Sequence, residues 1–157
     1  MRDLSVSSGL WEATIRLLQP YAMREVESGC FWYGNRTETA GFALLVGIPF
    51  QINHRRNFEI PSEALATLVR SLPSPDLVVV AQIHTHPGED TEHSPWDDDL
   101  MVSRKIYSLV LPRYGRLPCP IEAARVHRFV EGRWLTVDPA DPASRIRVLP
   151  EVIDTRT

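Results

Sequence analysis

The sequence predicts one domain of mixed α/β class, with an α+β-like arrangement of helices around a mixed sheet. Its 157 residues, 43% of them hydrophobic, are enough for one ordinary core and too few for two. Hydrophobic periodicity gives the element order α, β, β, α, β, α, β, β, β. Because strands and helices do not alternate regularly, a doubly wound parallel sheet is disfavoured.

Two amphipathic helices are predicted in the first half of the chain. Apolar residues recur at helical spacing over 10–18, after two serines at 7–8, either of which can cap the helix. Pro20 is expected to end this helix, since proline removes a backbone donor and clashes with the preceding turn. Pro61, at a first helical position, opens the second helix, whose apolar residues over 65–72 follow i, i+3, i+4, i+7 spacing.

The remaining apolar runs are expected to be strands. The segment LVVVAQIH at 77–84 is almost continuously apolar and β-branched, which is typical of a central strand covered on both faces. Further strands are predicted at 30–33, 41–49, 107–111, 125–130 and 133–137, the last two as a hairpin around Glu131-Gly132. We therefore expect the domain to span residues 1–137 and the proline-containing segment 138–157 to form an extended tail of unknown role.

Composition argues against several classes of protein. A net charge of −3 and the lack of a dense Lys/Arg run argue against a nucleic-acid partner. No apolar run is long enough to span a membrane, and the N-terminus lacks the basic start and apolar stretch of a signal peptide. Two cysteines, Cys30 and Cys119, form neither a disulfide framework nor a CxxC pair. We expect a cytoplasmic protein, and its oligomeric state stays open.

Two histidines, His84 and His86, stand at the end of the predicted central strand. Residues at i and i+2 of an extended chain point to the same side, so both imidazoles can reach one ion. Catalytic zinc typically takes three protein ligands and leaves its fourth position to water. Asp97 is the candidate third ligand, because the loop after Pro87 can turn back and present its carboxylate from the first turn of a following helix.

The same residues have a purely structural interpretation. Ser94-Pro95-Trp96-Asp97 is a good capping box, with serine at the N-cap and an acidic residue at N3. Taken alone these residues favour capping, and an isolated His-x-His pair is more often hydrogen-bonded or solvated than metal-bound. The two histidines, the tight Pro87-Gly88 exit and the returning carboxylate favour a metal site when they are considered together.

This spacing resembles a family motif. His84-Thr85-His86-Pro87, followed after six residues by Ser94-Pro95-Trp96-Asp97, resembles the H-x-H-P-x6-S-x-x-D motif of the JAMM (JAB/MPN+) zinc metalloproteases. The resemblance, which covers roughly residues 10–137, implies an MPN/JAB-type curved mixed sheet flanked by helices, with cytidine-deaminase-like layering. It also implies one Zn²⁺ per chain, held by His84, His86 and Asp97. The compact chain is similar to stand-alone prokaryotic JAB-type peptidases.

The family also carries an upstream glutamate, in a segment of the form E-x-x-G-x-x-x-G. Residues 27–34 resemble this segment, with Cys30 where glycine is usual. Anchoring on Gly34 places Glu27 in the glutamate position, and Glu25 stays open as an alternative. The resemblance implies that Glu27 is the general base acting on zinc-activated water and that Ser94 donates to the oxyanion.

The resemblance implies a zinc-dependent peptidase or isopeptidase that cleaves after the C-terminal tail of a ubiquitin-like protein. The expected partner is that protein or its conjugate. One alternative is a non-catalytic MPN-type binding or scaffold module, which is disfavoured because such modules typically lose the metal ligands. Another is a RadC-like DNA-associated protein, which is disfavoured by the acidic charge balance. His54, His93 and His127 lack partners at ligand spacing, and we expect them to be surface or packed residues.

Overall fold

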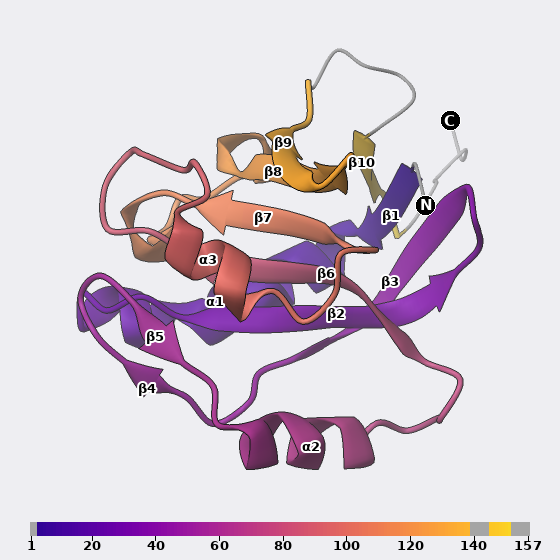
Figure 1. Ribbon diagram of the computed structural model, residues 1–157, viewed down its shortest axis with the longest axis horizontal. Coiled ribbons are helices and arrows are strands. Elements are labelled where there is room, and N and C mark those ends of the chain that lie inside the picture. The colour runs from indigo at the N-terminus through magenta and orange to yellow at the C-terminus, as the bar shows by residue number, and fades with distance from the viewer. Residues whose placement is uncertain (1–2, 139–144, 152–157) are drawn as a thin grey trace, which may run out of the picture.

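The computed structural model describes residues 3–138 and 145–151, and Figure 1 shows their arrangement. The helices are α1 (Ser8–Met23), α2 (Ser62–Arg70) and α3 (Pro95–Leu100), with 3₁₀ turns η1 (Arg113–Gly115) and η2 (Ile121–Ala123). The strands are β1 (Asp3–Ser7), β2 (Gly29–Arg36), β3 (Ala40–Gly47), β4 (Ile52–Asn53), β5 (Phe58–Glu59), β6 (Val78–Thr85), β7 (Tyr107–Leu111), β8 (Arg125–Val130), β9 (Arg133–Thr136) and β10 (Arg145–Leu149).

Eight of these strands form one curved mixed sheet in the order β10-β1-β3-β2-β6-β7-β8-β9 (Figure 1). The β1–β10, β1–β3 and β6–β7 pairs are parallel, and the other neighbouring pairs are antiparallel. β4 and β5 make a separate two-stranded sheet. The predicted mixed α/β class, with a curved sheet flanked by helices, is confirmed.

β6 is the central strand that the sequence predicts. It lies between β2 and β7, and it is buried from Val80 to Thr85. Side chains alternate across a strand, so Ala81 and Ile83 enter the main core, in which Trp11 and Leu18 of α1 also lie. Gln82 faces the opposite way and bonds the carbonyl of Leu100 in α3. The two helices therefore cover opposite faces of β6, as Figure 1 shows with α3 in front and α1 behind.

Two predicted helix boundaries are wrong. α1 does not end at Pro20 but runs to Met23. Pro20 lies in its last turn, where a proline removes a single backbone hydrogen bond and leaves the earlier turns intact. Pro61 is the N-cap of α2 rather than its first helical residue, because its carbonyl already accepts bonds from the Ala64 and Leu65 amides.

Several short strands are absent from the sequence expectation. β1 precedes α1 and pairs on one side with β3 and on the other with β10. β10 falls within the segment expected to be a tail, and it forms one edge of the sheet. Residues 139–144 and 152–157 of that segment lie outside the described residues. None of the described helices combines the length and apolar character that a membrane crossing needs.

Candidate metal centre

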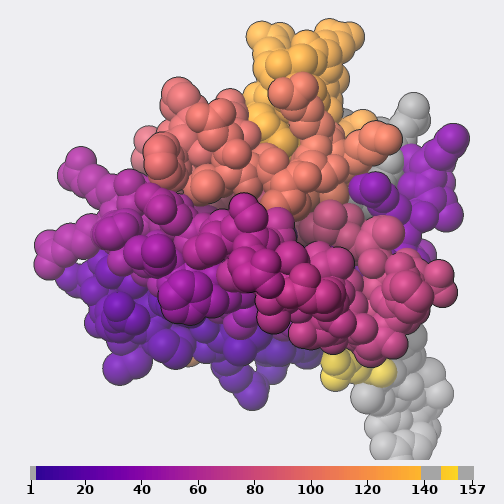
Figure 2. Space-filling view, turned by 60° about the horizontal axis from the view of Figure 1, so that its bottom comes forward, coloured from indigo at the N-terminus to yellow at the C-terminus, as the bar shows by residue number. Residues whose placement is uncertain are grey.

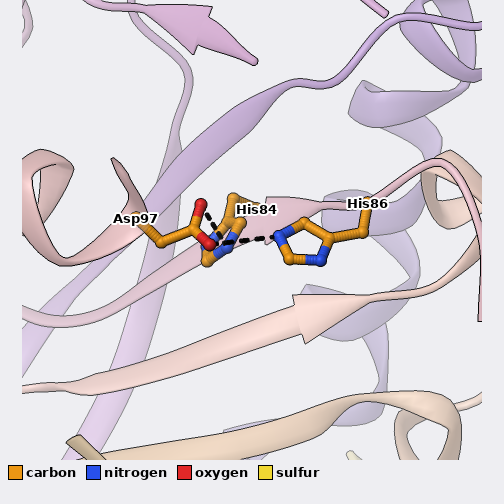
Figure 3. Close-up of side chains that lie close together, drawn as sticks. All are labelled: His84, His86 and Asp97. Carbon is orange, nitrogen blue, oxygen red and sulfur yellow. Dashed lines mark ion pairs between the residues drawn. The ribbon is translucent and has the colours of Figure 1, made fainter. Parts of the chain in front are cut away.

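Three side chains converge where β6 ends (Figure 3). His84 lies on β6, His86 follows just beyond it, and Asp97 comes from the first turn of α3. One potential ligand atom from each residue lies within 4.8 Å of the other two. His84 and Asp97 are buried, with 2% and 4% of their side chains exposed, whereas His86 is only partly buried. The three residues that the motif singled out are thus brought together and could hold a metal ion.

The spacing of the ligand atoms fits a single cation. Nε2 of His84 lies 3.3 Å from Oδ1 of Asp97, and Nε2 of His86 lies 3.3 Å from Oδ2. Ligand atoms placed about 2.0–2.1 Å from a tetrahedral zinc ion are about 3.3–3.4 Å from each other. Both ring nitrogens of His84 are buried and have no hydrogen-bond partner among the described residues. Such an orphaned buried group calls for a partner, and a metal ion at Nε2 supplies one.

A backbone contact fixes the tautomer of neutral His86. Its Nδ1 atom lies 2.9 Å from the carbonyl oxygen of Asp90. A carbonyl only accepts, so Nδ1 carries the proton, and the Nε2 lone pair of the neutral ring faces the Asp97 carboxylate. Burial lowers the pKa of His86, but Asp97, the Asp90 carbonyl and Glu27 raise it more, so it lies above its usual value. The space between Nε2 and the carboxylate thus favours a cation, either a proton or a metal ion.

The ionisation states of the other two residues suit metal binding. Burial lowers the pKa of His84, which keeps this imidazole neutral. Burial raises the pKa of Asp97, but His84, His86 and the backbone amide of Ser94 lower it more, so the carboxylate is ionised. A metal ion requires deprotonated ligands, and this pair offers a neutral imidazole beside a carboxylate.

Ser94 holds the Asp97 carboxylate directly. Its backbone amide and its hydroxyl each donate to Oδ2 of Asp97 at 2.7 Å. In return, Oγ of Ser94 accepts a hydrogen bond from the Asp97 amide at 3.2 Å, which completes a capping box at the start of α3. The structure therefore places Ser94 beside the site with its hydroxyl engaged by Asp97.

The two candidate glutamates have different surroundings. Glu27 is 6% exposed and lies just before β2, close enough to His86 and Asp97 for their charges to act on it. Burial raises its pKa from 4.5 to about 7, with a smaller lowering by His86 and a raising by Asp97. Glu25 has a left-handed backbone at φ 54°, and its half-exposed side chain lies 3.6 Å from Arg116. Only Glu27 is coupled to the candidate metal centre.

The segment that carries Glu27 is held by the chain before and within the β4–β5 hairpin. The Glu27 amide donates to the His54 carbonyl at 2.8 Å, and the Asn53 side chain donates to the Glu27 carbonyl at 2.8 Å. The Gln51 amide bonds both backbone groups of Gly29 at 2.9 Å, as a neighbouring strand would. These contacts fix the backbone on either side of Ser28, and so fix where Glu27 enters the site.

Two histidines that the sequence left outside the site lie next to it. The ring centroids of His93 and His84 are 5.6 Å apart, and those of His93 and His127 are 4.5 Å apart. His127 is buried, and its Nε2 atom lies 2.9 Å from the carbonyl of Thr91 in the motif loop. Neither residue stands at ligand spacing in the sequence. The only sequence signal was that His93 directly precedes Ser94.

A cleft lies beside α3, on the face shown in Figure 2 where α2 (magenta) adjoins the segment around residue 100 (salmon). Its volume is about 650 Å³. Apolar side chains line most of it, among them Phe31, Leu65, Val69, Leu100, Met101 and Val102. α2 contributes no fully buried residue, so its apolar face is only partly covered. Asp99 and Leu100 in the cleft follow Asp97 by two and three residues.

Comparison with known proteins identifies a shared fold. Neither a family model nor a curated protein matches this chain. Protein DSY2949 from Desulfitobacterium hafniense, a structural-genomics target with a solution structure, resembles it with a TM-score of 0.69. The superposition covers 94% of this chain and 95% of that chain at 12% sequence identity. At this identity the likeness concerns the fold alone, so the site must be interpreted from its own residues.

Proposed function

We propose that this protein is a zinc-dependent peptidase or isopeptidase of the JAMM type. The observation that carries the proposal is the convergence of His84, His86 and Asp97 on one point, with Glu27 buried beside them. Imidazole nitrogen and carboxylate oxygen are ordinary zinc ligands, and three of them leave a position open, as catalytic zinc sites require. The two cysteines are both buried and lie outside this group, so the donor set contains no thiolate.

Zinc, when bound, supplies a Lewis acid that polarises the scissile carbonyl and lowers the pKa of water. Glu27 is suited to move the proton, because a pKa of about 7 lets its carboxylate accept a proton from water and return it to the leaving amine. Asp90 holds His86 through Nδ1, and Ser94 holds Asp97 through Oδ2. Each of these contacts orients a ligand from outside and keeps its ligand atom directed into the site.

We propose the C-terminal tail of a ubiquitin-like protein as the substrate, from the motif resemblance. An extended tail can bind by adding a strand to an exposed sheet edge. The small β4–β5 sheet contacts the Glu27 segment through β4 and the residues beside it, and among the described residues no further strand pairs with β5, which leaves the β5 edge open. The apolar cleft between α2 and α3 adjoins the same helix as Asp97. These two features support a linear apolar peptide rather than a charged small molecule.

Metal analysis tests the centre. The purified chain is expected to bind one zinc ion, and His86→Ala and Asp97→Ala are each expected to lose nearly all of it. If both variants retain one zinc ion per chain, the assignment of His86 and Asp97 as zinc ligands is wrong. His54→Ala is the matched control, because the His54 side chain is exposed. The substitution keeps the backbone carbonyl of residue 54, which accepts the hydrogen bond from the Glu27 amide.

Cleavage tests the reaction. A panel of ubiquitin-like proteins with C-terminal peptide fusions or isopeptide-linked lysines is expected to contain substrates that the zinc-loaded protein cleaves. Cleavage should stop on chelation and return on adding zinc. A protein that binds zinc and one of these partners tightly without cleaving it would support the non-catalytic binding module instead. Binding to DNA with no cleavage would support the RadC-like alternative.

A further inference from the structure

The side chain of His93 bridges the motif loop, helix α3 and the sheet. Its Nδ1 atom lies 2.8 Å from Oδ1 of Asp98 in α3, and its Nε2 atom lies 2.6 Å from Oγ of Ser108 in β7. Only 6% of the His93 side chain is exposed. Both ring nitrogens are engaged at short distances, which makes His93 a link of defined geometry between two elements.

The same ring packs against a candidate metal ligand. It stands edge-on to His84, with centroids 5.6 Å apart and an interplanar angle of 66°. His127 and Trp134 pack against His93, with centroid distances of 4.5 Å and 5.1 Å. The His84 ring nitrogens have no hydrogen-bond partner among the described residues, although Nε2 lies 3.3 Å from Asp97. The rings that pack against His84, which belong to His93, His86 and Phe58, therefore contribute to its orientation.

Helix α3 needs such a link because it has only six residues, too few for an independently stable helix. Ser94 caps its start. The Gln82 side chain holds its end, with contacts of 3.2 Å to the Leu100 carbonyl and 3.3 Å to the Val102 amide. His93 adds a third tie at Asp98, the residue next to the candidate ligand Asp97.

Asp98, His93 and Ser108 are hydrogen-bonded in the order found in serine hydrolases, but a nucleophilic role for Ser108 is excluded. Ser108 is entirely buried in β7, which is paired on both sides by β6 and β8. A nucleophile must reach the substrate, and no substrate reaches this position. The three residues thus form a structural bridge under the candidate centre.

We propose that His93 is a positioning residue for the metal centre, holding Asp97 through Asp98 and α3 and holding His84 by ring packing. The inference rests on the proposed metal site and does not require that the protein cleaves a substrate. Groups that orient metal ligands from outside the coordination shell typically change metal affinity by about 10–100-fold when they are removed. His93 should therefore alter metal binding itself, beyond any general effect on folding.

The test compares metal affinity and spectra of variants. His93→Phe keeps an aromatic ring but breaks both hydrogen bonds, and it is expected to weaken Zn²⁺ binding about 10–100-fold in a chelator competition. With Co²⁺ as a probe, its visible absorption bands are expected to shift, because they report the ligand geometry. His93→Asn, whose amide nitrogen can occupy the place of Nδ1 and donate to Asp98, is expected to recover part of the affinity.

Asp98→Asn tests the same hydrogen-bonded bridge without changing the buried ring of His93. It therefore keeps the proposal testable if the His93 variants fail to fold. The Asp98 side chain is 48% exposed, so this change removes the charge at one end of the bridge without opening the core. It is expected to weaken Zn²⁺ binding by roughly tenfold. Asp99→Asn is the matched control: it removes the same charge one residue further along α3, away from His93, and should bind Zn²⁺ and Co²⁺ like the parent.

Three outcomes would overturn the inference. If His93→Phe and Asp98→Asn both bind Zn²⁺ within about twofold of the parent with unchanged Co²⁺ spectra, His93 has no positioning role. If Asp99→Asn weakens binding as much as Asp98→Asn, the effect is one of charge alone. If the parent protein binds neither Zn²⁺ nor Co²⁺, both the proposed metal centre and the positioning role of His93 are contradicted. A parent that binds metal but cleaves no substrate affects only the proposed activity.

Discussion

The hydroxyl of Ser94 donates a 2.7 Å hydrogen bond to Oδ2 of Asp97 while it accepts one from the Asp97 amide. The capping box and the candidate metal site, which are alternatives in the sequence, are therefore one arrangement in the structure. The residue that caps α3 also holds the carboxylate of Asp97, the candidate third ligand. Oδ1 of Asp97 receives no bond from Ser94 and faces His84.

Ser94→Ala is expected to lower both stability and zinc affinity. Loss of an N-cap side chain costs about 1 kcal/mol of unfolding free energy, and loss of a ligand's outer partner weakens metal binding about 10–100-fold. Urea unfolding of the metal-free protein and chelator competition measure the two effects. Ser94→Thr, which keeps the hydroxyl, should retain most of both. If Ser94→Ala binds zinc normally and only turnover falls, the serine serves the oxyanion rather than Asp97.

As the pH is lowered, zinc binding should begin to weaken at a higher pH than it would if the ligand were a histidine with the usual pKa. Asp97, the Asp90 carbonyl and Glu27 outweigh burial and raise the pKa of His86 above 6.5. A proton at Nε2 competes with the metal, so apparent affinity falls as the pH drops through this raised pKa. Zinc titrations across the pH range measure this affinity. Repeating them in a second buffer gives the number of protons released on binding. Affinity that stays constant down to pH 6 would contradict the assignment of His86 as a ligand.

Cys30 should be chemically inert in the folded protein. It is fully buried at the start of β2, and burial raises the pKa of its thiol to about 12. Because the thiolate is the reactive form, alkylation by iodoacetamide should require unfolding. Mass spectrometry of protein treated with and without urea checks this. Any peptidase activity should survive thiol reagents and disappear with zinc chelators. Cleavage that depends on Cys30 would overturn the proposed chemistry.

Most of the main elements could be predicted because their signals are local. The continuous apolar run of β6 and the capping box of α3 both depend on neighbouring residues. β1 and β10 could not be predicted in the same way. They pair with each other across more than 130 residues, and β10 lies between prolines in a segment that resembles a tail. The two-residue strands β4 and β5 are too short to show any periodicity.

The candidate site also contains some residues whose place could be predicted from the sequence and others whose place could not. His84, His86 and Asp97 lie close in sequence at a spacing set by one strand and one short loop, so their convergence was predictable. The register against Gly34 favours Glu27 and leaves Glu25 open, and the sequence could not show that Glu25 has a left-handed backbone and lies beside Arg116. The contacts of His93 could not be predicted, because its partner Ser108 comes from the next strand of the sheet.

Glu27→Gln and Glu25→Gln should separate the two glutamates in catalysis. A general base that does not bind the metal can be replaced without emptying the site, so Glu27→Gln should keep its zinc and lose about 10²–10⁴-fold in turnover. Glu25→Gln should stay active, since its half-exposed side chain lies beside Arg116. Single-turnover cleavage beside zinc content decides between them. An inactive Glu25→Gln with an active Glu27→Gln would reverse the assignment.

Glu27 should also make the metal-free protein less stable as pH rises. Burial raises its pKa from 4.5 to about 7, so between these values the folded state keeps a proton that the unfolded state has lost. The unfolding free energy therefore falls with increasing pH, by about 3 kcal/mol once both states are ionised. Glutamine cannot ionise, so Glu27→Gln should match the parent near pH 4 and exceed it by up to that amount near pH 8.

Urea unfolding of the metal-free parent and Glu27→Gln across this pH range measures the difference, and taking the difference removes most of the contribution of the other titrating groups. Glu25→Gln is the control, because it makes the same chemical change at a half-exposed side chain that lies beside Arg116. Added zinc should reduce the difference between the parent and Glu27→Gln, since a divalent cation nearby favours the ionised carboxylate. A difference that does not change with pH would mean that the pKa of Glu27 is the same in the folded and the unfolded state. Glu27 would then lack the raised pKa that a base returning its proton to a leaving amine requires.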